Sequence, residues 1–310
     1  SIIGELLVLF GGLRLDSSVG KGPIGENVYS SSQVTGELLI FDTRAATWRQ
    51  IDYEGRAPAQ PDRADGEREK PRRMSKNEQD VVERPEAPHY IMDGEKPRAR
   101  FEHASATITT RGRWLFVHGG RSAKHAYPIE SCFVMEVGEK ALHWKRLIPG
   151  RVTQMAQADP TQTGSLLQAQ ARKKQFVRRG HTICTVPNYP RRMVMFGGRM
   201  DSGEEGRVCS ELMIVEVNAE MGTYMILPHS AIGAPPTARI YHSAAILSHF
   251  LVIFGGVSRK GEVLGDLHLL HMGPMIWTKI RAPVDPKMSG VFWPSPRFGC
   301  AAVTVSCSAR

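Results

Sequence analysis

The sequence lacks several features that would place it in a broad class at once. None of its apolar runs reaches about 18 residues, so no membrane-spanning helix is expected. Its five cysteines are odd in number and include no C-x-x-C pair, which argues against a disulfide framework or a thiolate metal site. Free thiols are typical of a reducing compartment, so we expect a cytoplasmic protein, with the nucleus and the cytoskeleton as alternatives.

Motifs for catalysis and for nucleic-acid recognition are also missing. No Ser/His/Asp arrangement, glycine-rich phosphate loop or pair of acids stands in a convincing context, so we predict no catalytic, cofactor-binding or metal-binding residue. The net charge is +9, but there is no zinc knuckle or interleaved aromatic platform, and nucleic acid is not an expected partner. No obvious oligomerisation signal is present. What the chain has instead is a repeat.

Four short hydrophobic runs of the chain end in a pair of glycines. Each run is uncharged and rich in β-branched, aromatic and long aliphatic residues, as buried strands are. The glycines allow a positive φ and the close approach of a neighbouring strand. The pairs are Gly11-Gly12, Gly119-Gly120, Gly197-Gly198 and Gly255-Gly256. Such recurrence indicates a repeat architecture rather than a single site.

The flanks of the glycine pairs recur as well. Upstream, an arginine precedes a histidine and an apolar strand, at a distance from the glycine pair that fits a two-stranded hairpin. These starts are Arg100 with His103, Arg178 with His181 (with Arg179 and Gly180 between them), and Arg239 with His242. Downstream, a polar loop leads to a third strand, predicted at residues 37–41, 131–137, 211–217 and 266–271. An aromatic residue closes each unit: Trp48, Trp144, Tyr224 and Trp277.

This unit of four strands, with a glycine pair after the second and an aromatic residue in the fourth, resembles the kelch repeat. The resemblance covers most of the chain apart from two insertions. It implies an all-β fold, a kelch-type β-propeller of four-stranded antiparallel blades, of which about four are visible. The aromatic residues are expected to pack between blades. The motif is specific for the fold and not for a function.

We expect residues 1–310 to form a single propeller domain with two disordered insertions between blades. The first, residues 55–98, is rich in proline and charge and contains ten acidic and ten basic residues. The second, residues 149–178, leads through the basic run RKKQFVRR into the next blade. For this run, a nuclear localisation signal and a contact with RNA or an acidic protein are alternatives to a solvated loop.

The two ends of the chain complement one another in the repeat. The first unit begins at its second strand, and residues 297–310 supply a first strand with nothing after it. Two interpretations stay open: the ends pair and close a ring of four blades, or the chain is part of a propeller with six or seven blades. The two differ in whether residues 297–305 lie beside residues 5–10.

Arginines recur at one face of the expected propeller. In a four-stranded blade, the loop from the second to the third strand and the connection to the next blade open on the same face, and both insertions emerge there. One arginine follows each glycine pair and another begins each inner strand. The eight are Arg14, Arg121, Arg199, Arg259, Arg100, Arg179, Arg239 and Arg297. Because the guanidinium fork suits carboxylate and phosphate, they predict a face that binds an acidic or phosphorylated segment of another protein.

Some of these residues have alternative roles. The inner-strand arginines could instead bond backbone carbonyls or pair with acids inside the ring. A ring of His103, His181 and His242 suggests a metal, but equivalent positions in radial blades are separated by the channel, and structural histidines are favoured. The predicted function is a non-catalytic protein-interaction module, such as a scaffold or adaptor. The alternative is a small-molecule enzyme of the oxidase or isomerase type, with titratable groups converging in a central-channel pocket.

Overall fold

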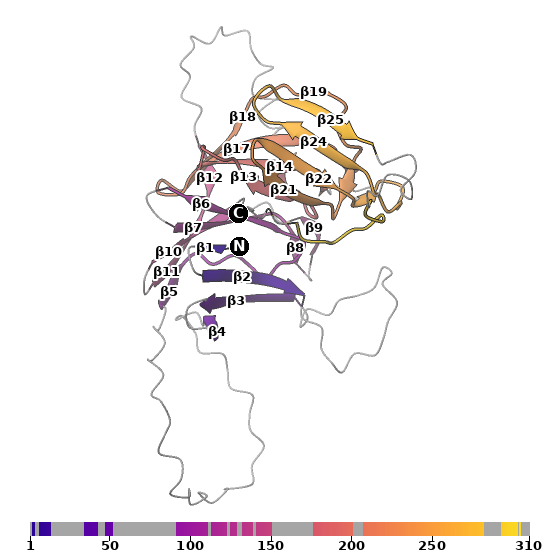
Figure 1. Ribbon diagram of the computed structural model, residues 1–310. Helices are drawn as coiled ribbons and strands as arrows, with labels where there is room; N and C mark the ends of the chain where they lie inside the picture. Colours follow the sequence, from indigo (N-terminus) through magenta and orange to yellow (C-terminus); the bar gives the residue numbers. More distant parts are fainter. Residues whose placement is uncertain are drawn as a thin grey trace, which may run out of the picture.

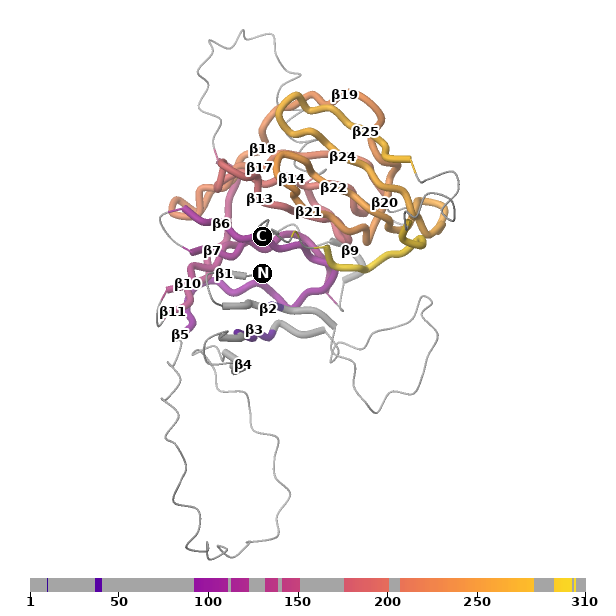
Figure 2. Tube along the Cα trace, in the orientation of Figure 1, coloured from indigo at the N-terminus to yellow at the C-terminus, as the bar shows by residue number. Residues whose placement is uncertain are grey.

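The computed structural model describes 13 segments of the chain, whose path is traced in Figure 2. They are residues 2–3, 6–13, 34–42, 47–51, 91–110, 113–122, 125–128, 132–138, 141–150, 176–200, 207–281, 293–302 and 304. In the first sheet, side chains are described only at residues 10 and 37–40. Arg14, the side chain of Trp48 and most of both insertions lie outside this description. No helix in the described part has the length and apolarity to cross a bilayer.

Four main sheets follow one another along the chain and lie side by side (Figure 1). We number these blades 1 to 4. Blade 1 contains β1 (Ile2–Ile3), β2 (Leu6–Leu13), β3 (Val34–Asp42) and β4 (Thr47–Ile51). Blade 2 contains β6 (Ala104–Thr109), β7 (Arg113–His118), β10 (Cys132–Val137) and β11 (Ala141–Arg146). Blade 3 contains β13 (Thr182–Thr185), β14 (Arg192–Phe196), β17 (Leu212–Asn218) and β18 (Thr223–Leu227). Blade 4 contains β21 (Ser243–Leu247), β22 (Phe250–Phe254), β24 (Leu267–His271) and β25 (Ile276–Ile280).

Within each blade these four strands are antiparallel, and the prediction of an all-β propeller with four-stranded blades is confirmed. The first strands of blades 2, 3 and 4 lie innermost, since β13 contacts both β6 and β21. Short ribbons extend the blades at one end. They are β8 (Arg121–Ser122) with β9 (His125–Pro128), β15 (Arg199–Met200) with β16 (Arg207–Val208), and β20 (Arg239–Ile240) with β23 (Val257–Ser258).

A fifth strand, which the sequence did not predict, lies at the outer edge of blades 2, 3 and 4. These strands are β5 (Ile91–Gly94), β12 (Ile148–Pro149) and β19 (Ile232–Gly233). Each belongs to the connection that leads into its blade and pairs in parallel with the outermost strand, β11, β18 or β25. Residues 91–94 of the first predicted insertion and residue 149 of the second therefore belong to strands that backbone hydrogen bonds hold, rather than to disordered segments.

The inner position of blade 1 is occupied by β1, which pairs with β2 through Ile2 opposite Leu7 and Ile3 opposite Leu6. Residues 293–302 lie against blade 4 instead, where the Gly256 N–H donates to the Arg297 carbonyl at 2.9 Å. Of the two interpretations left open, the one in which the ends pair requires this C-terminal segment beside β2, and that pairing is not present among the described residues.

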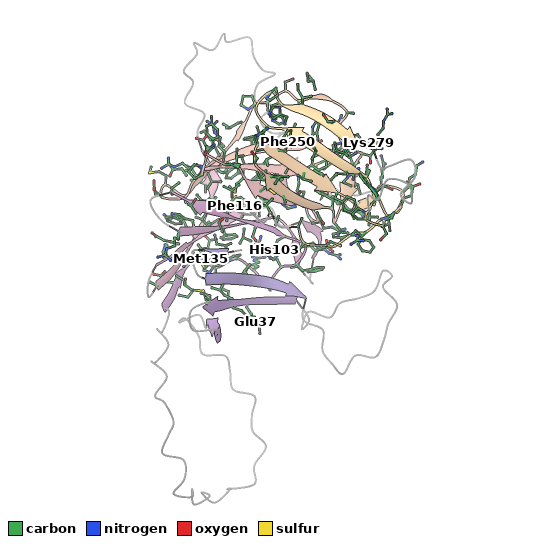
Figure 3. All side chains as sticks on the ribbon, in the orientation of Figure 1. Glu37, His103, Phe116, Met135, Phe250 and Lys279 are labelled. Atoms are coloured by element: carbon green, nitrogen blue, oxygen red, sulfur yellow. The ribbon has the colours of Figure 1, made fainter. Side chains whose placement is uncertain are left out.

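Apolar side chains fill the spaces between neighbouring blades in three clusters. Successive residues of a strand point to opposite faces, so the central strands of a blade supply two clusters at once. In β10, Phe133 and Met135 face blade 1, whereas Cys132 and Val134 face blade 3. Figure 3 labels Met135 and Phe116, one on each side of blade 2. This two-sided burial explains why the second strands read as continuous hydrophobic runs. The closing aromatics Trp144, Tyr224 and Trp277 are buried in these clusters, as predicted.

The glycine pairs lie where the backbones of two neighbouring blades meet, a region that we call the joint. Gly119 has a φ of +65°, and a Cβ atom there would lie 2.1 Å from the Arg178 carbonyl oxygen of the next blade. The following N–H, that of Gly120, donates to this same carbonyl at 3.1 Å. Equivalent bonds join Gly198 to Arg239 and Gly256 to Arg297. The pair is therefore needed because the backbones of two blades touch at this point.

Candidate functional site

Three arginines at the starts of inner strands are buried and use their donors inside the propeller. Arg100, Arg178 and Arg239 are each 0% exposed. In each, Nη1 donates to the carbonyl of the first glycine of its own blade, at 3.0 Å to Gly119, 2.9 Å to Gly197 and 2.9 Å to Gly255. Arg100 and Arg239 therefore have the alternative role, in which the arginine bonds backbone carbonyls inside the propeller. The expectation that they line an exposed face is wrong.

Acidic partners complete two of these sites. Arg239 forms a bidentate pair with Asp266, at 2.7 and 2.9 Å, and Arg178 donates to Glu211 Oε2 at 3.2 Å. Burial favours the neutral form of Asp266, but hydrogen bonds from Arg239 and His268 outweigh it and hold the pKa of this carboxyl well below its usual range. Burial lowers the pKa of Arg100 to about 10, which still leaves it charged at neutral pH.

In the third copy, the residue equivalent to Arg100 and Arg239 is Arg178, whereas the predicted set of eight arginines contains its neighbour Arg179. Arg178 has the same carbonyl contact as Arg100 and Arg239, and it lies three residues before His181. Arg179 is equivalent in the repeat to Phe101 and Ile240, and its side chain pairs with Glu102. In the last copy, Arg297 is exposed, and its Nε donates to the Ser295 carbonyl at 3.0 Å.

The arginines that follow the glycine pairs lie at the same end of the blades as the inner-strand starts. Arg121 and Phe101 exchange backbone hydrogen bonds at 2.9 Å, and Arg199 and Arg179 do so at 2.8 and 3.1 Å. The Arg121 and Arg199 side chains are partly exposed, and Arg259 is exposed. We call this end of blades 2 to 4 the inner-loop face. It brings together Arg121, Arg179, Arg199 and Arg259 of the predicted eight.

A chain of backbone hydrogen bonds crosses the inner-loop face from blade to blade. The Gly180 N–H donates to the Glu102 carbonyl at 2.9 Å, Tyr241 to Gly180 at 2.9 Å, and Gly299 to Tyr241 at 2.8 Å. All four residues have positive φ, from 55° to 66°. They stand at the same repeat position, immediately before the histidine or, in the last copy, Cys300. Glycine suits this backbone, so Glu102 and Tyr241 are the two exceptions.

These two exceptions and two arginines form a cluster, which we call the Glu102 cluster: Glu102, Arg121, Arg179 and Tyr241. Glu102 Oε1 accepts from Arg121 Nη2 at 3.0 Å, and Oε2 accepts from Arg179 Nη1 at 2.5 Å. The Arg121 guanidinium also lies over the Phe101 ring, 4.5 Å from its centroid. Burial, together with the charge and hydrogen bond of Glu102, raises the pKa of Tyr241 to about 12. The cluster thus joins blades 2, 3 and 4. Sequence reasoning missed Glu102, although an acid where other copies have glycine was a usable signal.

Two histidines of the repeat, His181 and His242, lie inside the joints, where the first glycine of the preceding blade meets them. A Cβ atom at Gly197 would lie 2.9 Å from the His242 ring. Burial lowers the pKa of His103 to about 4 and that of His242 to about 3, and nearby arginines add to both effects. His181 bonds His118 at 2.9 Å between ring nitrogens. No three His, Cys, Asp or Glu side chains of the described part converge as metal ligands would.

Comparison with known proteins identifies the repeat independently. Residues 159–308 match a family model described as the KLHDC2/KLHL20/DRC7 Kelch-repeats domain. Acyl-CoA-binding domain-containing protein 4 of Arabidopsis thaliana is 29% identical over 210 residues, covering 67% of this chain and 26% of that protein. Kelch domain-containing protein 3 of Homo sapiens is 26% identical over 189 residues, covering 60% of this chain and 43% of that protein. The matches therefore span less than half the length of these relatives.

Proposed function

The chain is a kelch-repeat protein, and we propose that its propeller is a non-catalytic interaction module that binds an acidic or phosphorylated segment of a partner protein on the inner-loop face. Kelch-repeat domains serve generally as protein-interaction modules. The finer assignment, an anionic segment recognised by arginine, rests on the residues of that face.

The observation that carries the proposal is the division among the arginines. The guanidinium groups of Arg100, Arg178 and Arg239 donate hydrogen bonds to carbonyls within the propeller, so these arginines are not available to a ligand. Arg121 and Arg199, in the short strands β8 and β15, and Arg259, in the turn after β23, follow the glycine pairs and keep part of their surface in water. A guanidinium offers five donors in a planar fork, and carboxylates and phosphates match this fork in two places at once. Several such forks at one end of the propeller favour an extended anionic segment over a single small ion.

The titratable groups support an interaction module rather than an enzyme. Burial lowers the pKa values of His118, His181 and His242, which are packed in the joints between blades. A buried imidazole that contacts glycine backbones and other rings holds the blades in register. It has no room to meet a substrate, whereas the arginines of the inner-loop face do meet solvent.

The experiment is a binding titration with defined probes. Fluorescent peptides of poly-glutamate and of phosphoserine-glycine repeats are titrated with the wild-type chain, with a poly-glutamine peptide as the neutral control. The double variant Arg199→Glu/Arg259→Glu should weaken binding of the charged probes about tenfold or more, since two donors become repelling charges. Its free energy of unfolding should fall by no more than about 1 kcal/mol, because Arg259 is exposed and Arg199 is partly exposed.

A matched control separates a defined face from the general attraction of a basic protein. Arg113→Glu/Arg191→Glu makes the same change in net charge at the hairpins on the opposite end of blades 2 and 3. We expect this control to bind the probes within about twofold of wild type at 0.15 M salt, where charges beyond about 8 Å are screened. Equal losses of affinity for the probes in the two double variants would show that the probes do not bind specifically at the inner-loop face.

A further inference from the structure

Glu102 occupies a backbone position that is unfavourable for it. Its φ is 58°, in the left-handed region, whereas Gly180 and Gly299 stand at the same position of later blades. A non-glycine residue held there is strained, and such strain is concentrated at functional sites. The carbonyl bond from Gly180 needs only the Glu102 backbone, so the fold itself does not require this side chain. The role of Glu102 therefore lies in its carboxylate.

That carboxylate fills the space between two arginine forks. Arg121 comes from the same blade and Arg179 from the next, and they meet different oxygens of Glu102, at 3.0 and 2.5 Å. Tyr241, from a third blade, lies close enough for the charge of Glu102 to raise the pKa of its hydroxyl. The Glu102 side chain is only 13% exposed. Each oxygen thus takes the place that an oxygen of an incoming carboxylate or phosphate would take.

The ring of Tyr241 covers the cluster from the side of blade 4. A Cβ atom at Gly180 would lie 3.0 Å from Cε1 and 3.2 Å from Cδ1 of this ring. The absence of a side chain at Gly180 therefore allows Tyr241 to lie over the backbone and reach both Glu102 and Arg179, whose Nη1 is 3.5 Å from the hydroxyl oxygen. Three blades contribute to holding one carboxylate, an arrangement more specific than a surface ion pair.

We propose that Glu102 is an internal stand-in for the acidic ligand, which holds the forks of Arg121 and Arg179 in position and must be displaced when the partner's anionic group binds. This rests on the proposed function, and it names the two arginines that Glu102 restrains. Swinging out returns the Glu102 carboxylate to water and transfers its hydrogen bonds to the ligand. Glu102 therefore lowers affinity and rejects weakly charged segments, because a ligand has to compete with a carboxylate that is already in place.

The test measures the same poly-glutamate and phosphoserine probes on Glu102→Gln. We expect the affinity for both probes to rise about tenfold, because two partly buried ion pairs no longer have to be broken. Glu262→Gln is the matched control. It adds the same charge on an exposed loop of the same face, where Glu262 contacts Ser258 rather than an arginine, and it should raise affinity less than about twofold. A second variant, Glu102→Gly, introduces the residue found at the equivalent positions and should show the same gain.

The outcomes separate this inference from the proposed function. Suppose that the wild type binds the probes and that Arg199→Glu/Arg259→Glu lowers the affinity. If Glu102→Gln then has the same affinity as Glu262→Gln, or a lower one, Glu102 is not a stand-in for the ligand, but the proposed binding face remains. If the wild type does not bind and Glu102→Gln does, the stand-in is supported directly. Absence of binding in the wild type and in both Glu102 variants overturns both ideas.

Discussion

The joints between the blades and the inner-loop face use the same residue type, arginine, for different purposes. In the joints, Arg100, Arg178 and Arg239 recur with the same contact to a glycine carbonyl, and all are fully buried. On the inner-loop face the arginines differ in position and partner from blade to blade. Recurrence in a repeat protein therefore marks architecture, and departure from it marks the places open to function.

The difference extends to the neighbours of each arginine. A joint combines a glycine pair, a neutral histidine and an apolar cluster, and each of its parts is in contact with backbone. The inner-loop face contains residues such as Glu102 and Tyr241 at a backbone position where Gly180 and Gly299 are the unstrained choice. Substitutions in the joints should therefore change stability strongly, whereas substitutions on the inner-loop face should change it little.

The largest expected effect is a loss of stability in mild acid. His118, His181 and His242 are neutral in the fold, because burial first and neighbouring positive charges second lower their pKa values, to about 3 for His118. In the unfolded chain they titrate near 6.5. Their contribution is present above that pH and is lost as the pH falls below it, by roughly 2 kcal/mol each for His118 and His242 at pH 5, and His181 acts in the same direction.

Urea unfolding followed at pH 7.5, 6.5, 5.5 and 5 checks this prediction. The free energy of unfolding should fall by several kcal/mol across the series, with most of the fall below pH 6.5. The bond between His118 and His181 adds to the effect, since two imidazolium rings would both be donors. A flat profile between pH 6.5 and 5 would show that these rings titrate normally and that the joints are looser than the structure indicates.

The next largest effect is expected from Arg239→Met. This change keeps much of the apolar stem but leaves Asp266 without its bidentate partner and the Gly255 carbonyl without a donor. Removing one member of a buried pair costs about 3 to 5 kcal/mol, because the remaining charge stays desolvated. Urea denaturation of Arg239→Met beside Arg259→Met, an exposed arginine of the same blade, measures the difference. A similar free energy of unfolding in the two variants would contradict the structural role of Arg239.

A smaller effect is expected from alanine at a glycine of the joint. Gly119→Ala combines a positive φ with a Cβ atom 2.1 Å from the Arg178 carbonyl oxygen, so we expect a loss of about 2 to 4 kcal/mol. Gly261→Ala is the matched control, because Gly261 has a φ of +84° and no heavy atom within 4 Å of its added Cβ. It should lose only about 1 kcal/mol, from the backbone alone. Thermal or urea unfolding of both variants distinguishes crowding at the joint from the cost of the backbone conformation.

Much of the blade could be predicted from the sequence because its constraints recur. The glycine pairs are required where two backbones touch, and the aromatics Trp144, Tyr224 and Trp277 are buried at equivalent places. The third strands were predicted within a few residues of β3, β10, β17 and β24. The fifth strands were not, since β5, β12 and β19 are joined through backbone hydrogen bonds, which leave little trace in the side-chain pattern.

The candidate site was only partly predictable for a related reason. A sequence shows that arginines recur but not whether a fork is already occupied, and Arg100 and Arg239 proved to be occupied. In the third copy, Arg179 was chosen for the set of eight, although the spacing of Arg178 from His181 matches that of Arg100 from His103. Glu102 escaped notice because its importance depends on Arg179 of the next blade, 77 residues away.

The most direct test of the division among the arginines compares two neighbours, Arg178→Lys and Arg179→Lys, by urea unfolding. The substitutions are identical and keep the charge, but lysine cannot span both the Gly197 carbonyl and Glu211 as Arg178 does, whereas it can still pair with Glu102 in place of Arg179. We predict that Arg178→Lys loses about 2 to 3 kcal/mol of unfolding free energy and Arg179→Lys less than about 1 kcal/mol. Equal losses, or a larger loss at Arg179, would contradict the assignment of one arginine to the joint and the other to the binding face.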